Sequence, residues 1–141
     1  MKAFAPDSKM YTLLGGVFYP TGHIFIMYPT AEEANDAERR LLDAGFSGDS
    51  ISLLTPDDIH TKIASAVIDN DHMPSAGTEA ATARHYEELA REGHHAILVP
   101  VPKAKDAELA VAALKGTNIS YAQRYRLLVI EDIVGQANEK N

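Results

Sequence analysis

The sequence predicts an α+β fold in which a strand-helix-strand unit occurs twice, with a pair of helices inserted between the two copies. Two observations carry this prediction. Apolar runs followed by amphipathic helical patterns appear in both halves of the chain, and the positions of these patterns repeat at a constant spacing. Between them lies a stretch with helical periodicity and a polar loop, which interrupts the repeat rather than extending it.

The repeat joins positions that a strand and the inner face of a helix would both use. A spacing of 73 positions separates Ala34 from Ala107 (107 − 34) and the acid Glu33 from the acid Asp106 (106 − 33). The other matched pairs are Ile24 with Ile97, Phe25 with Leu98, Ile26 with Val99, Pro29 with Pro102, Ala31 with Ala104, Ala37 with Ala110, and Leu41 with Leu114. We interpret the repeat as one folding unit used twice; the alternative is a chance similarity between alanine-rich helices.

The first unit spans about residues 23–55. Its apolar run, 23–28, is typical of a central strand that is buried on both faces. Thr30 and Glu33 predict a capping box that starts a helix, and Gly45 predicts its end. A short second strand should follow at 51–55.

The second unit spans about residues 94–133. It contains a predicted strand at 95–99, a helix at about 104–115 that Gly116 ends, and a long last strand at 121–133. Because proline cannot donate a ladder hydrogen bond, Pro100 should lie at the end of the third strand or at a position that needs no donor.

Two such units in tandem favour the split arrangement of a ferredoxin-like fold, with a four-stranded antiparallel sheet whose two central strands are the first strands of the units. Both repeat helices would then cover one face of the sheet. The opposite face would need either the inserted segment or a partner subunit to cover it.

The insertion spans about residues 56–93. Thr55, Pro56 and Asp58 predict a helix start, and a stripe of Ile59, Ile63, Ala66 and Val67 continues with helical spacing. A polar loop at 69–77 follows. A second helix should run from about Thr78 to Glu92 and end at Gly93.

Composition favours one folded domain over residues 1–141. Apolar residues make up 45% and charged residues 23%, and the chain has no cysteine. The net charge of −7 disfavours nucleic acid as a partner. No apolar run is long enough for a membrane span or a signal-peptide core, so we expect a cytoplasmic protein with no membrane partner.

Three segments carry a resemblance to a known family: "TAEEANDAERRLLDAGFSGDSISLLTPDDI" after Pro29, "EGHHAILVPVPKAKDAELAVAALKGTN", and "YRLLVIEDI". In these segments the chain resembles the bacterial heat-induced or general-stress-protein type of ferredoxin-like domain, and it is similar to uncharacterised proteobacterial proteins. The quoted residues are packing and turn residues, so the resemblance implies a fold and a stress-associated setting. It brings no catalytic residues.

The six histidines are the only candidates for a metal site or a proton-transfer group. His94 and His95 are adjacent at a strand start, where neighbouring side chains face opposite ways. No HExxH motif occurs, and there is no phosphate or dinucleotide loop motif. We therefore predict no metal and no cofactor. The acids Asp57, Asp58, Glu87 and Glu88 are interpreted as first-turn and surface helix acids.

The candidate ligand-binding residues are Arg124, Arg126, His95 and Tyr125. Arg124 and Arg126 alternate along the last predicted strand and would share one sheet face, with Tyr121 and Tyr125 on the other. Together the two guanidinium groups could hold a carboxylate or phosphate. The simpler interpretation is that they pair with nearby acids.

Two functions from different classes remain open. The first is a non-enzymatic module that forms a homodimer or a higher oligomer through its sheet and binds a small anion or another protein. The second is a small cofactor-independent enzyme of the dimeric α+β barrel type, in which the four candidate residues would meet in one apolar cavity. Their convergence decides between the two.

Overall fold

The computed structural model describes residues 1–11, 18–64, 77–126 and 130–134. All six strands of this part belong to one mixed sheet with the order β1-β3-β4-β2-β5-β6. The strands are β1 (Lys2–Ala3), β2 (His23–Tyr28), β3 (Ser52–Leu54), β4 (His95–Pro100), β5 (Tyr121–Tyr125) and β6 (Ile130–Val134). The α-helices are α1 (Ala31–Asp43), α2 (Pro56–Ile59), α4 (Gly77–Arg91) and α5 (Ala104–Ala113); short 3-10 turns lie at Ser8–Met10 and Gly48–Ser50.

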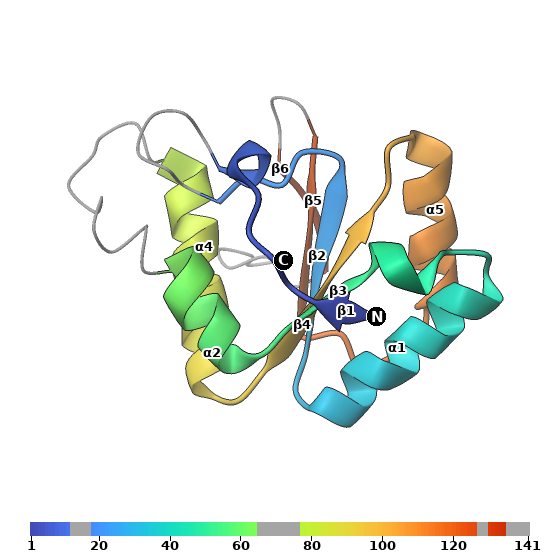
Figure 1. Ribbon diagram of the computed structural model, residues 1–141, viewed down its shortest axis with the longest axis horizontal. Coiled ribbons are helices and arrows are strands. Elements are labelled where there is room, and N and C mark those ends of the chain that lie inside the picture. Colours follow the sequence, from blue (N-terminus) through green and yellow to red (C-terminus); the bar gives the residue numbers. More distant parts are fainter. Residues whose placement is uncertain (12–17, 65–76, 127–129, 135–141) are drawn as a thin grey trace.

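The helices form a layer on each side of the sheet (Figure 1). Helices α1 and α5 lie on one side, and α2 and α4 lie on the other. None of the helices in the described ranges is long and apolar enough to cross a membrane.

The two first strands of the repeat lie at the centre of the sheet, as predicted. β2 pairs antiparallel with β4 along its whole length, from His23 opposite Pro100 to Tyr28 opposite His95. Five consecutive residues of β2, 24–28, are buried, because helices cover this strand on both faces. Pro100 is the last residue of β4, which is the position that the missing N–H requires.

The prediction of a four-stranded antiparallel sheet was wrong in strand number and in direction. At one edge, β1 pairs in parallel with β3, and the backbone N–H groups of Lys2 and Phe4 donate to the carbonyls of Ile51 and Leu53. At the other edge, the predicted long strand 121–133 is divided into β5 and β6, which pair antiparallel. The chain therefore reverses between Tyr125 and Ile130, where the sequence has no glycine or proline to signal a turn.

The repeat helices begin at equivalent positions, which supports one unit used twice. Thr30 caps α1, its hydroxyl oxygen accepting from the Glu33 N–H at 3.1 Å. The predicted reciprocal bond is absent, because the Glu33 carboxylate accepts from the Thr30 hydroxyl instead of from the backbone. Lys103 holds the same position before α5, and its N–H donates to Asp106. Gly45 and Gly116 follow the two helices with positive φ, which suits glycine.

The insertion begins as predicted and then departs from the α-helical pattern. Thr55 and Asp58 form a complete capping box at the start of α2. Residues His60–Ala64 continue in π-helical form, and the predicted stripe positions Ala66 and Val67 lie outside the described residues. The second predicted helix, 78–92, is confirmed as α4 at 77–91.

The insertion resolves how the second sheet face is covered. Ile59, Ile63, Ala83 and Tyr86 of the insertion are buried against this face. The chain thus covers both faces of its own sheet within the described residues, and the need for a partner subunit on this face disappears.

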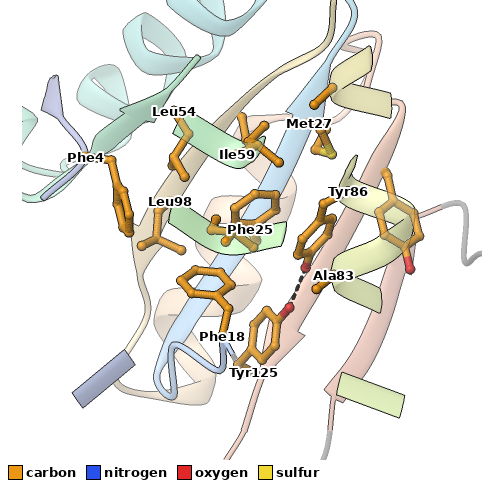
Figure 2. Packing of buried hydrophobic residues seen from close by; sticks show 14 residues of the cluster. Phe4, Phe18, Phe25, Met27, Leu54, Ile59, Ala83, Tyr86, Leu98 and Tyr125 are labelled. Atoms are coloured by element: carbon orange, nitrogen blue, oxygen red, sulfur yellow. Dashed lines mark hydrogen bonds between the residues drawn. The ribbon is translucent and has the colours of Figure 1, made fainter. Parts of the chain in front are cut away.

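The two faces have different side chains. The face under α2 and α4 carries an aromatic cluster, shown in Figure 2, in which Phe25 stacks on Tyr86 with ring centroids 4.0 Å apart. Its other aromatic members are Phe4, Phe18, Tyr121 and Tyr125, with Tyr11 and Tyr19 packed at the margin. The face under α1 and α5 is aliphatic, with Tyr28 as its one fully buried aromatic ring in the described chain; its helices contribute mainly alanine, as Ala34, Ala37, Ala107 and Ala110.

Candidate functional site

The four residues proposed from the sequence do not meet in one cavity. Along β2, His95 lies opposite Tyr28, whereas Arg124 lies opposite Ile24. At about 3.3 Å per strand residue, His95 is roughly 13 Å along the sheet from Arg124. Tyr125 belongs to the aromatic face and Arg124 borders a cavity under α5, so these two neighbours point to opposite sides. The convergence that the enzyme interpretation needs is therefore not present.

Arg124 and Arg126 also have different surroundings. Arg124 is half-buried on β5, whereas Arg126 follows the strand and is exposed. The carbonyl of Arg126 accepts a hydrogen bond from the Tyr19 hydroxyl at 2.7 Å. Only Arg124 lines a cavity described below, so the structure gives no support for a site shared by the two guanidinium groups.

Tyr125 is a core residue. Its hydroxyl lies 2.6 Å from the hydroxyl of Tyr86, inside the aromatic cluster (Figure 2). Rings of Phe18 and Tyr19 contact it edge to face. A hydrogen-bonded pair of buried hydroxyls satisfies the polar end of each ring, which is the usual requirement for burying tyrosine.

The described histidines form hydrogen bonds that hold the chain together. The Nδ1 atom of His94 lies 2.9 Å from the Ser120 hydroxyl oxygen, and the Nδ1 atom of His95 lies 3.1 Å from the Gly93 carbonyl oxygen. Within the described ranges, which leave out His72, no three residues with metal-binding side chains cluster closely enough for an ion.

Ser120, His94 and Glu92 have the side-chain types of a serine-hydrolase triad, but their geometry does not form one. The distance from His94 Nε2 to the Glu92 carboxylate is 3.8 Å, which is beyond hydrogen-bond range. Glu92 is also largely exposed, at 69% of its side chain. An orienting acid needs a firm hydrogen bond to the imidazole, and this arrangement does not supply it.

The interpretation of Glu87 as a surface helix acid was wrong, because this residue is buried. Its carboxylate lies 2.9 Å from His60 Nδ1 and accepts from Arg91 Nε at 3.0 Å. These contacts connect the π-helical turn after α2 to α4, beside a shallow cavity of about 270 Å³. Burial of the acid is compatible with stability because its charge has these partners. The sequence around Glu87 showed helical spacing, but it did not show that His60, 27 positions earlier in the chain, would be its partner.

The main candidate site is an apolar cavity of about 420 Å³ between α5 and the sheet. Its floor is formed by β2, β5 and β6, and its wall by α5 and the segment that follows this helix. The lining residues are Ile24, Ile26, Ala110, Val111, Leu114, Lys115, Gly116, Thr117, Ile119, Ala122 and Ile133. Two of the lining residues, Ala110 of α5 and Ala122 of β5, are small and leave space that larger side chains would fill.

A second cavity of about 410 Å³ continues along the same helix. The two cavities share Val111, Lys115 and Ile133. The other residues that line the second cavity are Ala107, Glu108, Ala112 and Arg124. We call the two together the α5 groove. It is apolar at the end near Ile119 and charged at the end near Arg124.

Polar groups near the apolar end are engaged with each other. Thr117 donates to the Leu114 carbonyl at 2.6 Å, and its hydroxyl also lies 2.8 Å from the Tyr28 hydroxyl. Burial raises the pKa of Tyr28 and exceeds the opposing effect of its Thr117 hydrogen bond, so this phenol is neutral at physiological pH. The apolar end therefore offers a ligand mainly hydrocarbon contact.

The α5 groove was not predicted from the sequence. Ile24 and Ile26 were assigned to the core, which is correct, and Arg124 was proposed as an anion-binding residue. One signal was present in the sequence: Val111 is apolar but lies outside the repeated inner positions Ala107, Ala110 and Leu114. In the structure this residue is 44% exposed. An isolated exposed valine is ordinary, however, and indicates a site only once its neighbours are known.

Comparison with known proteins gives no relative: no family model, no curated protein and no solved structure matches the chain.

Proposed function

We propose that the protein is a non-enzymatic binding module that holds a small, mainly apolar ligand in the α5 groove. The observation that carries the proposal is the cavity of about 420 Å³ between α5 and the sheet, lined almost entirely by aliphatic side chains. Its size falls in the range of pockets that enclose small molecules, and such pockets combine apolar walls with few polar groups.

A binding function fits the chemistry of the lining better than catalysis does. Of the described residues around the first cavity, only Lys115 has an ionisable side chain, and it is exposed at the rim. General acid-base catalysis requires a titratable group within hydrogen-bond reach of the reacting atoms, usually held in place by a second group. The aliphatic wall provides surface for binding and no such pair.

The setting of the protein is also part of this proposal. The resemblance supports a ferredoxin-like core made of β3, β4, β2 and β5 with α1 and α5, to which β1 and β6 add edge strands. It further supports a stress-associated role. A cytoplasmic location, expected from the lack of an apolar run long enough for a signal peptide or membrane span, is also part of the proposal. Homodimers or higher oligomers remain a proposal, but the bare sheet face that first favoured them is covered by α2 and α4.

Binding of anilinonaphthalene sulfonate, a dye that fluoresces in apolar pockets, tests the proposal. We expect saturable binding of one dye per chain and its loss in Val111→Trp, since Val111 lines both cavities. The matched control is Leu109→Trp, which changes an equally exposed residue of the same helix outside the groove. Circular dichroism would establish that both variants fold. Absence of saturable binding, or equal binding by folded Val111→Trp, would refute the proposal.

A further inference from the structure

We infer that the ligand of the α5 groove is an alkyl carboxylate, with its chain in the apolar cavity and its carboxylate between Lys115 and Arg124. This inference rests on the proposed function and deepens it by naming the chemical class of the ligand. Three properties of the groove support it: the shape of the cavities, the placement of charge and the absence of aromatic rings among the described lining residues.

The shape favours an elongated molecule. The two cavities lie one after the other along α5 and share Val111, Lys115 and Ile133. A ligand that occupies both must therefore extend along the helix. Its inner part would contact Ile24, Ile26 and Leu114, and its outer part would pass Val111 to reach the charged end.

Among the described lining residues, charged side chains lie at the junction of the two cavities and in the outer cavity. Lys115 lies where the cavities meet, and Arg124 lines the outer cavity. Among the described residues Lys115 has no salt-bridge partner. Arg124 has interactions within the protein, but a guanidinium carries five N–H donors and can bind a carboxylate in addition. These two cations stand out in a chain whose net charge is −7.

Glu108 is the one acid among the described residues that line the groove, and it lies in the outer cavity. Glu131 of β6 lies opposite Arg124 in the register of the two strands. These acids offset part of the positive charge of Lys115 and Arg124, so a single carboxylate is a better electrostatic match than a dianion such as a phosphate monoester. The negative charge of Glu108 also gives the inference a prediction of opposite sign, because removing that charge should strengthen anion binding.

The lining favours an alkyl chain over a flat ring. Apart from Lys115, the described residues around the inner cavity are aliphatic or small, whereas the aromatic side chains gather on the opposite sheet face. Aromatic ligands gain from stacking on aromatic side chains, which the α5 groove does not offer. Methylene groups gain from burial against any apolar surface.

Titration calorimetry with sodium decanoate and with decanol, which have the same chain and differ in the head group, tests the inference. We expect the wild-type protein to bind decanoate about tenfold more tightly than decanol, and the difference to shrink at high salt. Arg124→Gln and Lys115→Gln should each weaken decanoate binding several-fold and leave decanol binding unchanged. Glu108→Gln should strengthen decanoate binding by about two- to threefold.

Matched controls are Arg39→Gln and Lys105→Gln, which remove the same charges from α1 and α5 outside the groove, and both should bind decanoate as the wild type does. Equal affinity for decanoate and decanol would overturn the carboxylate inference and leave the apolar site intact. Binding of neither compound would overturn both the inference and the proposed function. Loss of decanoate binding in the control variants would also overturn the inference, because it would assign the effect to overall charge.

Discussion

The two faces of the sheet are covered by different kinds of side chain. Under α2 and α4, aromatic rings meet edge to face or stacked, as Phe25 does with Phe18 and Tyr86. Under α5, Ala110 of the helix and Ala122 of the sheet line a cavity of about 420 Å³. Large interlocking rings fill space, whereas small side chains bring a helix close without filling its margins. We expect the first face to provide stability and the second to provide the site.

The largest effect should come from truncating the centre of the aromatic face. Phe25→Ala removes a fully buried ring that contacts Phe18 and Tyr86, and should lower the free energy of unfolding by about 3–5 kcal/mol. The neighbouring residue Ile24 faces the α5 groove. Ile24→Ala should lower the free energy of unfolding by about 2 kcal/mol, because the space around this side chain is already incompletely filled. Urea titrations of both variants measure the difference. Equal losses would show that the faces are packed alike.

Adding two methyl groups should change the free energy of unfolding in opposite directions on the two faces. Ala96 is buried in β4 under the aromatic face, and Ala96→Val should destabilise the protein by about 1–3 kcal/mol through overpacking. Ala122 is buried in β5 beside the cavity, where Ala122→Val should be stabilising by about 0.5–1 kcal/mol. Thermal unfolding followed by circular dichroism reports both. Destabilisation by Ala122→Val would mean that the cavity cannot accept a larger wall residue.

The hydroxyl pair of the aromatic face should contribute less than the rings do. Tyr86→Phe removes one member of the pair and should cost about 1 kcal/mol, since it leaves the Tyr125 hydroxyl with fewer partners. Tyr125→Phe should cost about the same, and the double variant should cost less than the two together. The comparison variant is Tyr28→Phe. The Tyr28 hydroxyl forms a hydrogen bond with Thr117 at a less buried position on the other face. Strict additivity would contradict direct coupling between Tyr86 and Tyr125.

The smallest effect concerns the start of the insertion that carries the aromatic face. Desolvation acts to raise the pKa of Asp58, but hydrogen bonds from Thr55 and Lys62, together with the Lys62 charge, outweigh it and lower that pKa. A carboxyl whose pKa is lower in the folded state stabilises above its unfolded pKa, and this contribution disappears as pH falls through the folded value. We expect Asp58→Asn to cost about 0.5–1 kcal/mol at pH 7 and progressively less on acidification below about pH 4.

Guanidinium titrations at neutral and acidic pH measure this dependence. Asp57→Asn removes the same charge from the same turn and serves as the control. If both variants lose the same stability with the same pH dependence, the effect belongs to the charge of the first turn and not to the capping box.

Local signals in the sequence predicted the parts of the fold that local interactions determine. Thr30, Thr55 and Gly45 mark helix ends through contacts within a few residues, and these ends are where they were expected. The central pair of strands was predicted because unbroken apolar runs occur where a strand is buried on both faces.

What escaped prediction depends on contacts between distant residues. The reversal between β5 and β6 lacks a turn residue, and the pairing of β1 with β3 depends on backbone hydrogen bonds that no side chain signals. Glu87 has the sequence context of a surface acid, and its burial follows from His60 and Arg91. Arg124 was singled out as an anion-binding candidate, but the cavity beside it is a consequence of how α5 lies on the sheet.

The strand order has a consequence for synthesis of the chain. β2 pairs with β4 and β5, and β3 pairs with β4, so the two strands of the first unit are not neighbours in the sheet. While the ribosome has released only the first unit and the insertion, none of the described strand pairs that involve β2 can form. The apolar run of β2 must therefore wait for residues 95–100 to emerge, and during that interval it is an unpaired apolar segment that is prone to aggregate.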